Sequence, residues 1–268
     1  MYIETHIADH CNLNCACCSH YSPLSEPKFV DIIQYENDFK RLSELGKNKM
    51  ELIKLMGGEP LLNPKIKDLI IIARKYFSEC KIQIVTNGTL LTNQNEEFWE
   101  ICDKYRIEIL ISYYPVKLDY NSIKMKAKKH KVHINYSGGN TKREMSKFEL
   151  DRDGAGDYKK SFKKCKWANS CVNLRNGKIY PCPTAANIDI FNAYFGENFT
   201  LSEKDYIDIY KAQNIDEIFD FLCGPVPFCR FCTHNNENIE WRTSRKEKSE
   251  WMSDKDSALT AGQHESFH

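Results

Sequence analysis

Short apolar runs and helix-patterned segments alternate about five times along the first 140 residues, and this alternation constrains the fold most strongly. The strand-like runs are residues 2–8, 51–58, 81–88, 107–115 and 132–139, and the helix-like segments are residues 35–47, 64–77, 95–106 and 120–131. Strands that are joined through helices by short loops pair in parallel. We therefore predict an α/β fold with a parallel sheet, open or closed into a barrel, and Pro64 as the first residue of its helix.

Each dense polar motif of this region directly follows a predicted strand. The motifs are "ADHCNLNCACC" at 8–18, "MGGEP" at 56–60, "TNG" at 86–88 and "SYYP" at 112–115. Active sites of parallel α/β folds form at the carboxyl ends of the strands. We therefore expect the four motifs to converge on one rim of the sheet.

Three cysteines of the first motif have the spacing C-x3-C-x2-C: Cys11, Cys15 and Cys18. Three thiolates on one loop can each bind one iron of a [4Fe–4S] cluster. The fourth iron then stays open and can chelate a small molecule. The alternative is a structural zinc site, which needs four ligands and could be completed by His10 or His20.

Composition limits the class of protein. The chain has 268 residues and a formal net charge of +1, which gives no reason to expect nucleic acid or an acidic membrane surface as a partner. No run reaches the roughly 18–20 apolar residues of a membrane span, and no secretory signal peptide is visible. We expect a cytoplasmic protein, and in a reducing compartment its twelve cysteines favour metal ligands over disulfides.

Taken together, the motifs resemble the radical S-adenosylmethionine (SAM) superfamily. That family carries C-x3-C-x2-C after the first strand, a GGEP-type motif after the second, TNG after the third, and a polar residue such as serine at the end of the fourth. The matching positions are Cys11, Cys15, Cys18, Gly57, Gly58, Glu59, Pro60, Thr86, Asn87, Gly88 and Ser112. The resemblance covers residues 1 to about 140 and implies a partial (β/α)6-type parallel barrel.

The resemblance also implies the cofactors. A [4Fe–4S] cluster on the three cysteines binds SAM through its open iron, and one electron then releases a 5′-deoxyadenosyl radical that abstracts a hydrogen atom from the substrate. By motif match, residues 57–60 meet the SAM amino group and Ser112 its ribose or carboxylate, and Asn87 belongs to the same cofactor-binding set. Asn135 or Tyr136 is a candidate for the adenosine side. The implied protein partner is a flavodoxin- or ferredoxin-type reductant.

Cys17 departs from the family pattern. The residue before the last cysteine of the motif is usually aromatic and packs near the adenine, but here it is a thiol. One interpretation is a small residue that only fills the space. The other is a catalytic Cys17 that returns a hydrogen atom to a substrate radical.

A second group of cysteines lies in the C-terminal part of the chain: Cys165, Cys171, Cys182, Cys223, Cys229 and Cys232. Between the second and third of them, two β-rich runs flank Asn176-Gly177, which predicts a hairpin. Cys229 and Cys232 form C-x2-C. This pattern resembles the SPASM module of radical SAM enzymes and, with only six cysteines, its shorter one-cluster form, called twitch. The resemblance implies an auxiliary [4Fe–4S] cluster.

The ligand set that we favour for this cluster is Cys165, Cys182, Cys229 and Cys232. Cys171 can replace Cys165, because a C-x5-C pair also opens the SPASM pattern, and Cys223 can enter the set. A second, partial cluster and a structural zinc ribbon are the alternatives, since four thiolates suit either metal.

The chain is predicted to divide into a radical SAM core at 1–140, a linker at 141–164, a twitch-like module at 165–243 and a polar, frayed tail at 244–268. Residues 203–222 have a helical pattern. Cys80 and Cys102 also lie on helical patterns, and we interpret them as buried core thiols.

The family chemistry leaves the reaction open. An auxiliary cluster that accepts an electron from a substrate radical gives dehydrogenation, for example of a secondary alcohol to a ketone, whereas hydrogen return from a thiol gives epimerisation. Chain length and the twitch-type pattern look like the small-molecule dehydrogenase of aminoglycoside biosynthesis. We therefore expect a carbohydrate, aminocyclitol or nucleotide-sugar-like substrate. The alternatives are modification of a peptide or protein and, more remotely, a non-catalytic iron–sulfur electron-transfer protein.

Overall fold

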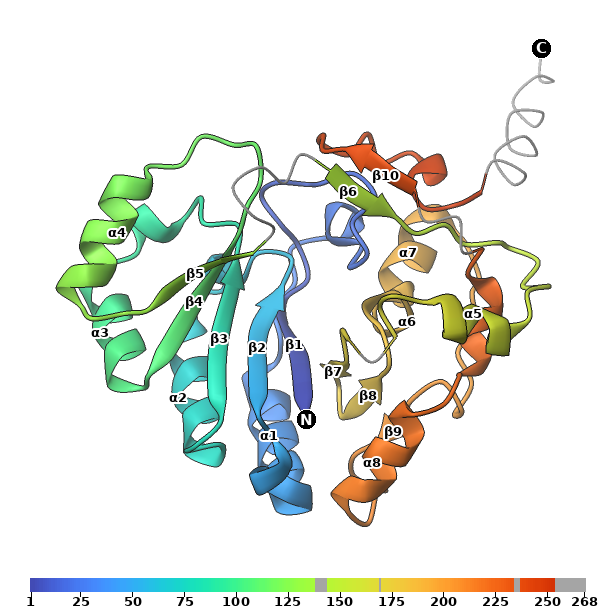
Figure 1. Ribbon diagram of the computed structural model, residues 1–268, viewed down its shortest axis with the longest axis horizontal. Helices are drawn as coiled ribbons and strands as arrows, with labels where there is room; N and C mark the ends of the chain where they lie inside the picture. The colour runs from blue at the N-terminus through green and yellow to red at the C-terminus, as the bar shows by residue number, and fades with distance from the viewer. Residues whose placement is uncertain (138–143, 169, 234–236, 254–268) are drawn as a thin grey trace.

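The computed structural model describes residues 1–137, 144–168, 170–233 and 237–253. Within these residues, eight strands form one sheet in the order β5-β4-β3-β2-β1-β7-β8-β9. The first five strands are parallel and are β1 (Tyr2–Ala8), β2 (Leu52–Gly57), β3 (Lys81–Thr86), β4 (Ile107–Ser112) and β5 (Ile134–Ser137). They lie side by side in Figure 1, which confirms the predicted α/β fold with a parallel sheet.

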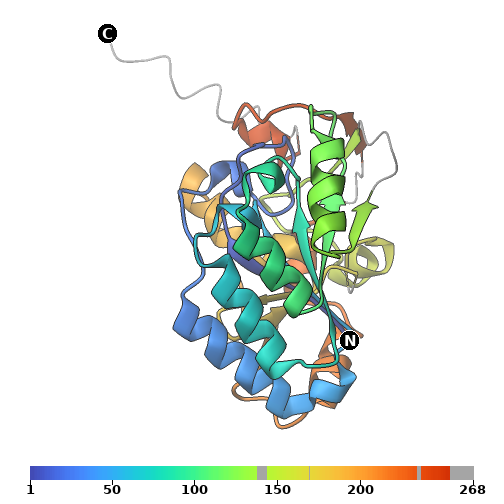
Figure 2. The ribbon, with the colours of Figure 1, turned by 90° about the vertical axis from the view of Figure 1, so that its left-hand side faces the viewer.

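Four helices connect these strands and cover one face of the sheet (Figure 2): α1 (Ile32–Gly46), α2 (Ile66–Tyr76), α3 (Glu96–Lys104) and α4 (Tyr120–Lys129). Helices α1, α3 and α4 each follow an Asp or Asn whose side chain accepts a backbone N–H of the first turn. The prediction that Pro64 is the first residue of α2 is wrong. The helix begins at Ile66, because Pro64 lies in a turn in which the Asn63 side chain accepts the N–H of Lys65.

A hairpin extends the sheet beyond β1. Its strands are β7 (Asn173–Arg175) and β8 (Lys178–Tyr180), and the two-residue strand β9 (Ile207–Asp208) follows. Strand β7 is parallel to β1 and antiparallel to β8, so a sixth parallel strand lies at the opposite end of the parallel set from β5. The predicted turn is confirmed, because Asn176 and Gly177 both have positive φ (50° and 72°), as a type I′ turn requires.

The two faces of the sheet differ in chemistry. A row of paired, buried isoleucines packs in the core between the sheet and the helices: Ile3, Ile53, Ile82 and Ile107. The next residue of each strand is polar, and with one residue of β7 these form a second row: Asn173, Glu4, Lys54, Gln83 and Glu108. Because side chains alternate between the faces of a strand, this polar row lies on the inner face, away from the helices.

The C-terminal half contains elements that the sequence pattern does not predict. Residues 203–222 are not one helix: the two-residue strand β9 lies in the first half, and α8 (Ile215–Leu222) begins only after its cap, Asn214. The pattern also misses α6 (Pro183–Ala186) and α7 (Ile188–Phe195). These helices have at most eight residues, too few for an apolar period to stand out.

The predicted linker at 141–164 also has secondary structure of its own. It contains β6 (Glu144–Lys147), which pairs antiparallel with β10 (Glu237–Glu240), and α5 (Tyr158–Lys164). The interpretation of this segment as a connection without secondary structure is therefore wrong. Its polar composition gives no apolar periodicity from which either element could be predicted. The domain boundaries themselves stay a prediction.

A second hydrophobic core contains Tyr21 and residues of the C-terminal half. Trp251 and Met252 are each only 1% exposed within it, and the Trp251 ring contacts the rings of Tyr21 and Phe191. The prediction of a frayed tail is therefore wrong for residues 244–253, because two large apolar side chains are buried there. The rest of that tail, residues 254–268, lies outside the described residues.

Among the described residues, no helix combines the length and the apolar character that crossing a membrane requires.

Candidate functional site

The motifs that follow β1, β2, β3 and β4 meet in one cavity at the carboxyl ends of these strands, as predicted. This rim cavity is lined by residues of all four motifs, among them Cys11, Cys15, Cys18, Gly57, Gly58, Asn87 and Ser112. The parallel order of the strands produces the convergence, because their carboxyl ends lie at one edge of the sheet.

N–H groups are directed at the thiols of the rim cavity. The backbone nitrogen of Leu13 lies 3.5 Å from Cys11 Sγ, and the Asn87 side-chain nitrogen lies 3.7 Å from it. The indole Nε1 of Trp241 donates to Cys15 Sγ over 3.1 Å. Burial raises the pKa of Cys11 to about 11, although the Leu13 N–H lowers it. A metal that displaces the thiol protons would leave thiolates already surrounded by donors.

Gly57 and Gly58 are required because two chain segments approach closely at the rim. A Cβ on Gly57 would lie 2.1 Å from the carbonyl oxygen of Ala8, and a Cβ on Gly58 would lie 2.1 Å from that of His10. Gly57 also has a φ of +136°, which favours glycine. The two glycines therefore let the end of β2 pack against the chain that leads into Cys11. A backbone contact with SAM stays a prediction.

Glu59 does not line the rim cavity. Its buried carboxylate accepts hydrogen bonds from the hydroxyl of Thr86 (2.6 Å) and from the backbone N–H groups of Asn87 (2.9 Å) and Leu61 (3.0 Å). Burial raises the pKa of Glu59 to about 7, and these hydrogen bonds lower it only in part. The carboxylate thus joins the second motif to the third. Pro60 is also buried, at the start of a 3-10 helix.

Of the other residues that we predicted to bind SAM, two line the rim cavity and one does not. Ser112 and Asn87 line the rim cavity, and Ser112 Oγ lies 3.5 Å from the hydroxyl of Ser137. Asn135 is not brought to the cavity. Its side-chain nitrogen donates to the Glu108 carboxylate over 3.1 Å, on the inner face of the sheet.

A second cavity gathers four cysteines from separate elements. Its thiols are those of the favoured ligand set: Cys165, Cys182, Cys229 and Cys232. The first follows α5, the second caps α6, and the last two lie within and directly after the 3-10 helix Pro227–Phe231. The backbone nitrogens of Trp167 and Ala168 lie 3.4 and 3.3 Å from Cys165 Sγ. We call this the auxiliary cavity.

The two remaining C-terminal cysteines do not line the auxiliary cavity. Cys223 is exposed at the end of α8. Burial raises the pKa of Cys171 to about 12; the charge of Glu4, on the inner face of the sheet, also raises it, and that of Lys54 lowers it. Of the two ligand sets left open by the spacing, the arrangement favours the one with Cys165.

Cys17 lines neither cavity. Its side chain is 2% exposed and its backbone has a φ of 56°. Burial raises the pKa of its thiol to about 11, and the charged groups around it are Glu250, Lys147 and Arg242. The hypothesis that Cys17 returns a hydrogen atom to substrate gains no support from this position.

The two cavities differ in the number of thiols that line them. Three line the rim cavity and four line the auxiliary cavity, and all twelve cysteines are free thiols. A [4Fe–4S] cluster with one open iron takes three thiolates and a closed one takes four, each on a different iron. The thiols present therefore match the implied clusters in number, and their role as ligands stays a prediction.

One short loop separates the two cavities. Cys18 and His20 line the rim cavity, while Ser19 between them lines the auxiliary cavity. The next residue, Tyr21, is 1% exposed. Burial raises its pKa strongly, and the thiols of Cys232, Cys182 and Cys18 act on it in the same direction. The Tyr21 ring thus lies near cysteines of both cavities.

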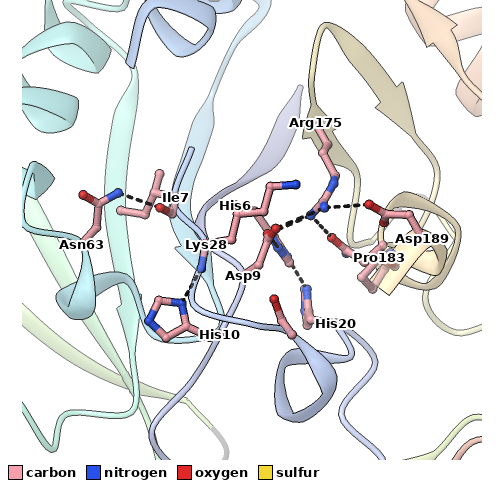
Figure 3. Close-up of polar contacts among 12 residues, drawn as sticks. His6, Ile7, Asp9, His10, His20, Lys28, Asn63, Arg175, Pro183 and Asp189 are labelled. Carbon is pink, nitrogen blue, oxygen red and sulfur yellow. Dashed lines mark hydrogen bonds and ion pairs between the residues drawn. The ribbon is translucent and has the colours of Figure 1, made fainter. Parts of the chain in front are cut away.

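A buried polar network also connects the two regions (Figure 3). Arg175 of β7 makes two hydrogen bonds with the Asp9 carboxylate, at 2.8 and 3.2 Å. The Asp9 carboxylate also contacts Nδ1 of His6 at 3.3 Å, and His6 Nε2 lies 2.6 Å from Nδ1 of His20. Burial would raise the pKa of Asp9, but His6 and Arg175 hold it at about 2.

The far end of this network reaches the auxiliary region. Arg175 also donates to Asn187 (2.7 Å) and Asp189 (3.1 Å), and the Asn187 side chain donates to the carbonyl of Pro183, which lines the auxiliary cavity. The network therefore fixes the hairpin and α7 against the segment that leads into the first cysteine loop.

Three residues at or beside the rim cavity were given no role from sequence: Tyr114, Met145 and Trp241. Tyr114 lies within the recognised motif at 112–115, so its position in a motif was an available signal. Met145 and Trp241 come from segments interpreted as linker and module end. Local sequence has no signal for them, because they reach the site only through the pairing of β6 with β10.

Comparison with known proteins identifies the N-terminal region. Residues 5–120 match the family model described as "Radical SAM superfamily". The chain is 35% identical over 99 residues to GTP 3′,8-cyclase of Clostridium botulinum, a match that covers 36% of this chain and 30% of that protein. GTP 3′,8-cyclase of Chlorobaculum tepidum is 31% identical over 93 residues, covering 35% and 27%. The chain thus spans less than a third of these curated relatives.

A solved structure resembles nearly the whole chain. BtrN in complex with AdoMet and 2-DOIA superposes with a TM-score of 0.53, covering 87% of this chain and 93% of that one, at 18% sequence identity. At this identity the likeness concerns the fold alone.

Proposed function

Because residues 5–120 of this chain form a radical SAM domain, we propose that the protein is a radical SAM dehydrogenase of a polar small molecule. The radical SAM domain implies SAM and a [4Fe–4S] cluster as cofactors. The proposal adds an auxiliary [4Fe–4S] cluster, in a twitch-like module, and a carbohydrate, aminocyclitol or nucleotide-sugar-like substrate. We also expect it to work in a reducing cytoplasm, where its free thiols stay available to metal.

The observation that carries this proposal is the wall of residues 18–20 that the two cysteine-lined cavities share. When bound, the cluster and SAM of the rim cavity supply a 5′-deoxyadenosyl radical that removes a hydrogen atom from substrate, and a cluster in the auxiliary cavity supplies a one-electron acceptor. Loss of one hydrogen atom, one electron and one proton converts a secondary alcohol into a ketone. Two sites separated by one loop suit such a sequence.

The residues of the chain would divide the work as follows. Cys11, Cys15 and Cys18 hold the first cluster, and Cys165, Cys182, Cys229 and Cys232 hold the second. In the rim cavity, the backbone at Gly57 and Gly58 and the side chain of Ser112 position SAM. Glu59 keeps the TNG segment in place through the hydrogen bonds to Thr86 and Asn87.

The position of Cys17 favours dehydrogenation over epimerisation. A hydrogen donor must reach the substrate radical, but the Cys17 thiol is buried outside both cavities, beside Glu250, Lys147 and Arg242. An auxiliary cluster as the electron acceptor needs no such thiol.

The polar substrate class rests on the resemblance of the sequence pattern. The polar row formed by Asn173, Glu4, Lys54, Gln83 and Glu108 lies two residues before Met56 and Val85, which line the rim cavity. Asn173, Glu4 and Gln83 are buried, and the row is paired within itself, for example through the 3.0 Å hydrogen bond from Gln83 to Glu108. The row therefore keeps the inner face of the sheet polar beneath the cavity.

We further propose that a one-electron carrier with an acidic surface docks on α5. Five exposed lysines surround this helix and the residue that follows it, Cys165: Lys159, Lys160, Lys163, Lys164 and Lys166. A local excess of positive charge steers an acidic partner toward the auxiliary cluster. Reversing two of these charges should slow electron transfer between the carrier and the auxiliary cluster. It should also weaken the dependence of that rate on ionic strength.

The experiment compares auxiliary-site variants with matched cysteine controls. Anaerobically reconstituted protein is given SAM, dithionite and a panel of sugars and aminocyclitols, and 5′-deoxyadenosine and ketone are quantified. In the Cys229→Ala/Cys232→Ala double variant, SAM cleavage should continue while ketone formation falls at least roughly tenfold. Cys171→Ala and Cys223→Ala remove thiols outside the cavity and should stay within about twofold of wild type.

Other outcomes would redirect the assignment. Ketone formation at the wild-type rate in the double variant contradicts an electron acceptor in the auxiliary cavity. SAM cleavage that is coupled only to peptide substrates would favour the alternative, peptide or protein modification. No SAM cleavage with an intact first cluster would revive the non-catalytic electron-transfer protein.

A further inference from the structure

The C-terminal segment of residues 237–252, which we call the strap, crosses over the first cysteine loop. It begins with β10 and then pairs with the loop: the N–H of Ala16 donates to the carbonyl of Arg242 (2.9 Å), and the N–H of Ser244 donates to the carbonyl of Asn14 (2.6 Å). Cys15 and Thr243 form an antiparallel bridge between these two bonds. The middle cysteine of the motif is thus held in a short two-stranded pairing.

A buried carboxylate fixes the strap in this position. Glu250 is 2% exposed and accepts hydrogen bonds from Arg242 Nη1 (2.6 Å), from the backbone N–H of Arg245 (2.9 Å) and from the hydroxyl of Ser244. Trp251 adds a second anchor, because its indole Nε1 donates to the carbonyl of Cys18 over 2.9 Å. The strap therefore folds back on itself and contacts the cysteine loop at Cys15 and at Cys18.

One side chain of the strap reaches a sulfur atom of the motif. The indole Nε1 of Trp241 donates to Cys15 Sγ over 3.1 Å, and the Trp241 ring lies 6.2 Å from the ring of Tyr114, which lines the rim cavity. Trp241 is half-buried and its donor is directed by the pairing described above. A hydrogen bond from a neutral N–H stabilises a sulfur ligand more as its negative charge increases.

We propose that Trp241 is a positioning residue that raises the reduction potential of the cluster on Cys11, Cys15 and Cys18. Reduction adds one electron to the cluster and increases the negative charge on its sulfur ligands, so the N–H···S bond stabilises the reduced form more than the oxidised form. Hydrogen bonds to the sulfurs are among the factors that set cluster potentials. This inference rests on the proposed assignment of the cluster to these cysteines, but not on the substrate or the reaction.

The test is a potentiometric EPR titration of reconstituted protein, followed through the signal that changes when SAM is added. Trp241→Phe keeps an aromatic ring and removes the N–H, while Trp241→Ala removes both. Both variants should lower the midpoint potential by a similar amount, about a tenfold change in the reduced-to-oxidised ratio at fixed potential, or about 59 mV for one electron.

The matched control is Trp99→Phe. Trp99 lies in the core on α3, and its Nε1 has no hydrogen-bond partner among the residues that the structure describes. Trp99→Phe makes the same chemical change on a helix that does not line the rim cavity, and it should leave the midpoint potential unchanged. A Trp241→Phe midpoint equal to that of Trp99→Phe would overturn the proposal.

A second measurement needs no variant. Wild-type protein labelled with 15N in its indole nitrogens should show, in pulsed EPR of the reduced SAM cluster, a coupled 15N and an exchangeable proton. Absence of both contradicts the hydrogen bond, even where Trp241 variants fail to fold. Since neither measurement uses substrate, a failed dehydrogenase assay leaves this result intact, and a failed titration leaves the proposed reaction intact.

Discussion

The two cysteine-lined cavities are built in different ways. The three cysteines of the rim cavity lie within eight residues, in a loop that starts at the end of β1, and β1 is a seven-residue strand paired on both sides. The four cysteines of the auxiliary cavity come from residues 165–232, on or beside elements of three to seven residues. The sheet therefore positions the first site, whereas we expect the second to depend more on the metal that it is proposed to hold.

The largest effect should come from removing the ligands of the rim cavity. In the Cys11→Ala/Cys15→Ala/Cys18→Ala variant, 5′-deoxyadenosine formation should fall to the level of the enzyme-free control. Iron should fall from about eight to about four atoms per chain, because the auxiliary cluster remains. Iron and sulfide analysis with EPR measures both. A variant that still cleaves SAM, or that holds no iron at all, contradicts the two-cluster description.

Metal removal should then separate the two regions. Hydrogen exchange of chelated and reconstituted protein should show a loss of protection concentrated in α5 and the 3-10 helix Pro227–Phe231, which lie outside the core of the sheet. Strands β1 to β4 should keep their protection, since the sheet and its helices share one continuous core. The expected contrast is at least roughly tenfold in exchange rate. Equal loss in both regions would mean that the sheet also needs its cluster to fold.

The next largest effect should be on the free energy of unfolding, through the polar network that joins the two regions. In Arg175→Met, the buried Asp9 carboxylate loses both of its bonds to the guanidinium, and leaving one partner of a buried pair alone costs about 3–5 kcal/mol. Denaturant unfolding of the reconstituted protein measures this loss. Asp189→Asn removes the exposed partner of the same arginine and should cost less than about 1 kcal/mol. Equal effects of the two variants would show that Asp9 is stable without Arg175.

The smallest effect is a pH dependence within the rim region. Burial raises the pKa of Glu59 to about 7 from its ordinary 4.5. Between these values the folded state holds a proton that the unfolded state has released, so the free energy of unfolding falls as pH rises, by about 3 kcal/mol across the window. Glu59→Gln should flatten this slope, and Glu51→Gln, at an exposed side chain, should not. Parallel pH profiles of Glu59→Gln and wild type would show that Glu59 does not titrate there.

The sequence by itself determined the sheet, the rim and the chemistry of the first cysteine loop. The apolar period that reveals a strand, the glycine pair that ends β2 and the spacing of Cys11, Cys15 and Cys18 are local properties of the chain. Because parallel strands bring their carboxyl ends to one edge, local patterns were enough to predict that the motifs meet.

Only the tertiary structure decided what each side chain faces. In the structure the Glu59 carboxylate is buried and bonded to Thr86, and Cys17 lies outside both cavities. Cys165 lines the auxiliary cavity, whereas Cys171 does not. The tertiary structure also brought Trp241 to Cys15 across 226 residues of sequence. These outcomes depend on packing between distant segments and on the direction of each backbone bond, which residue type and spacing do not encode.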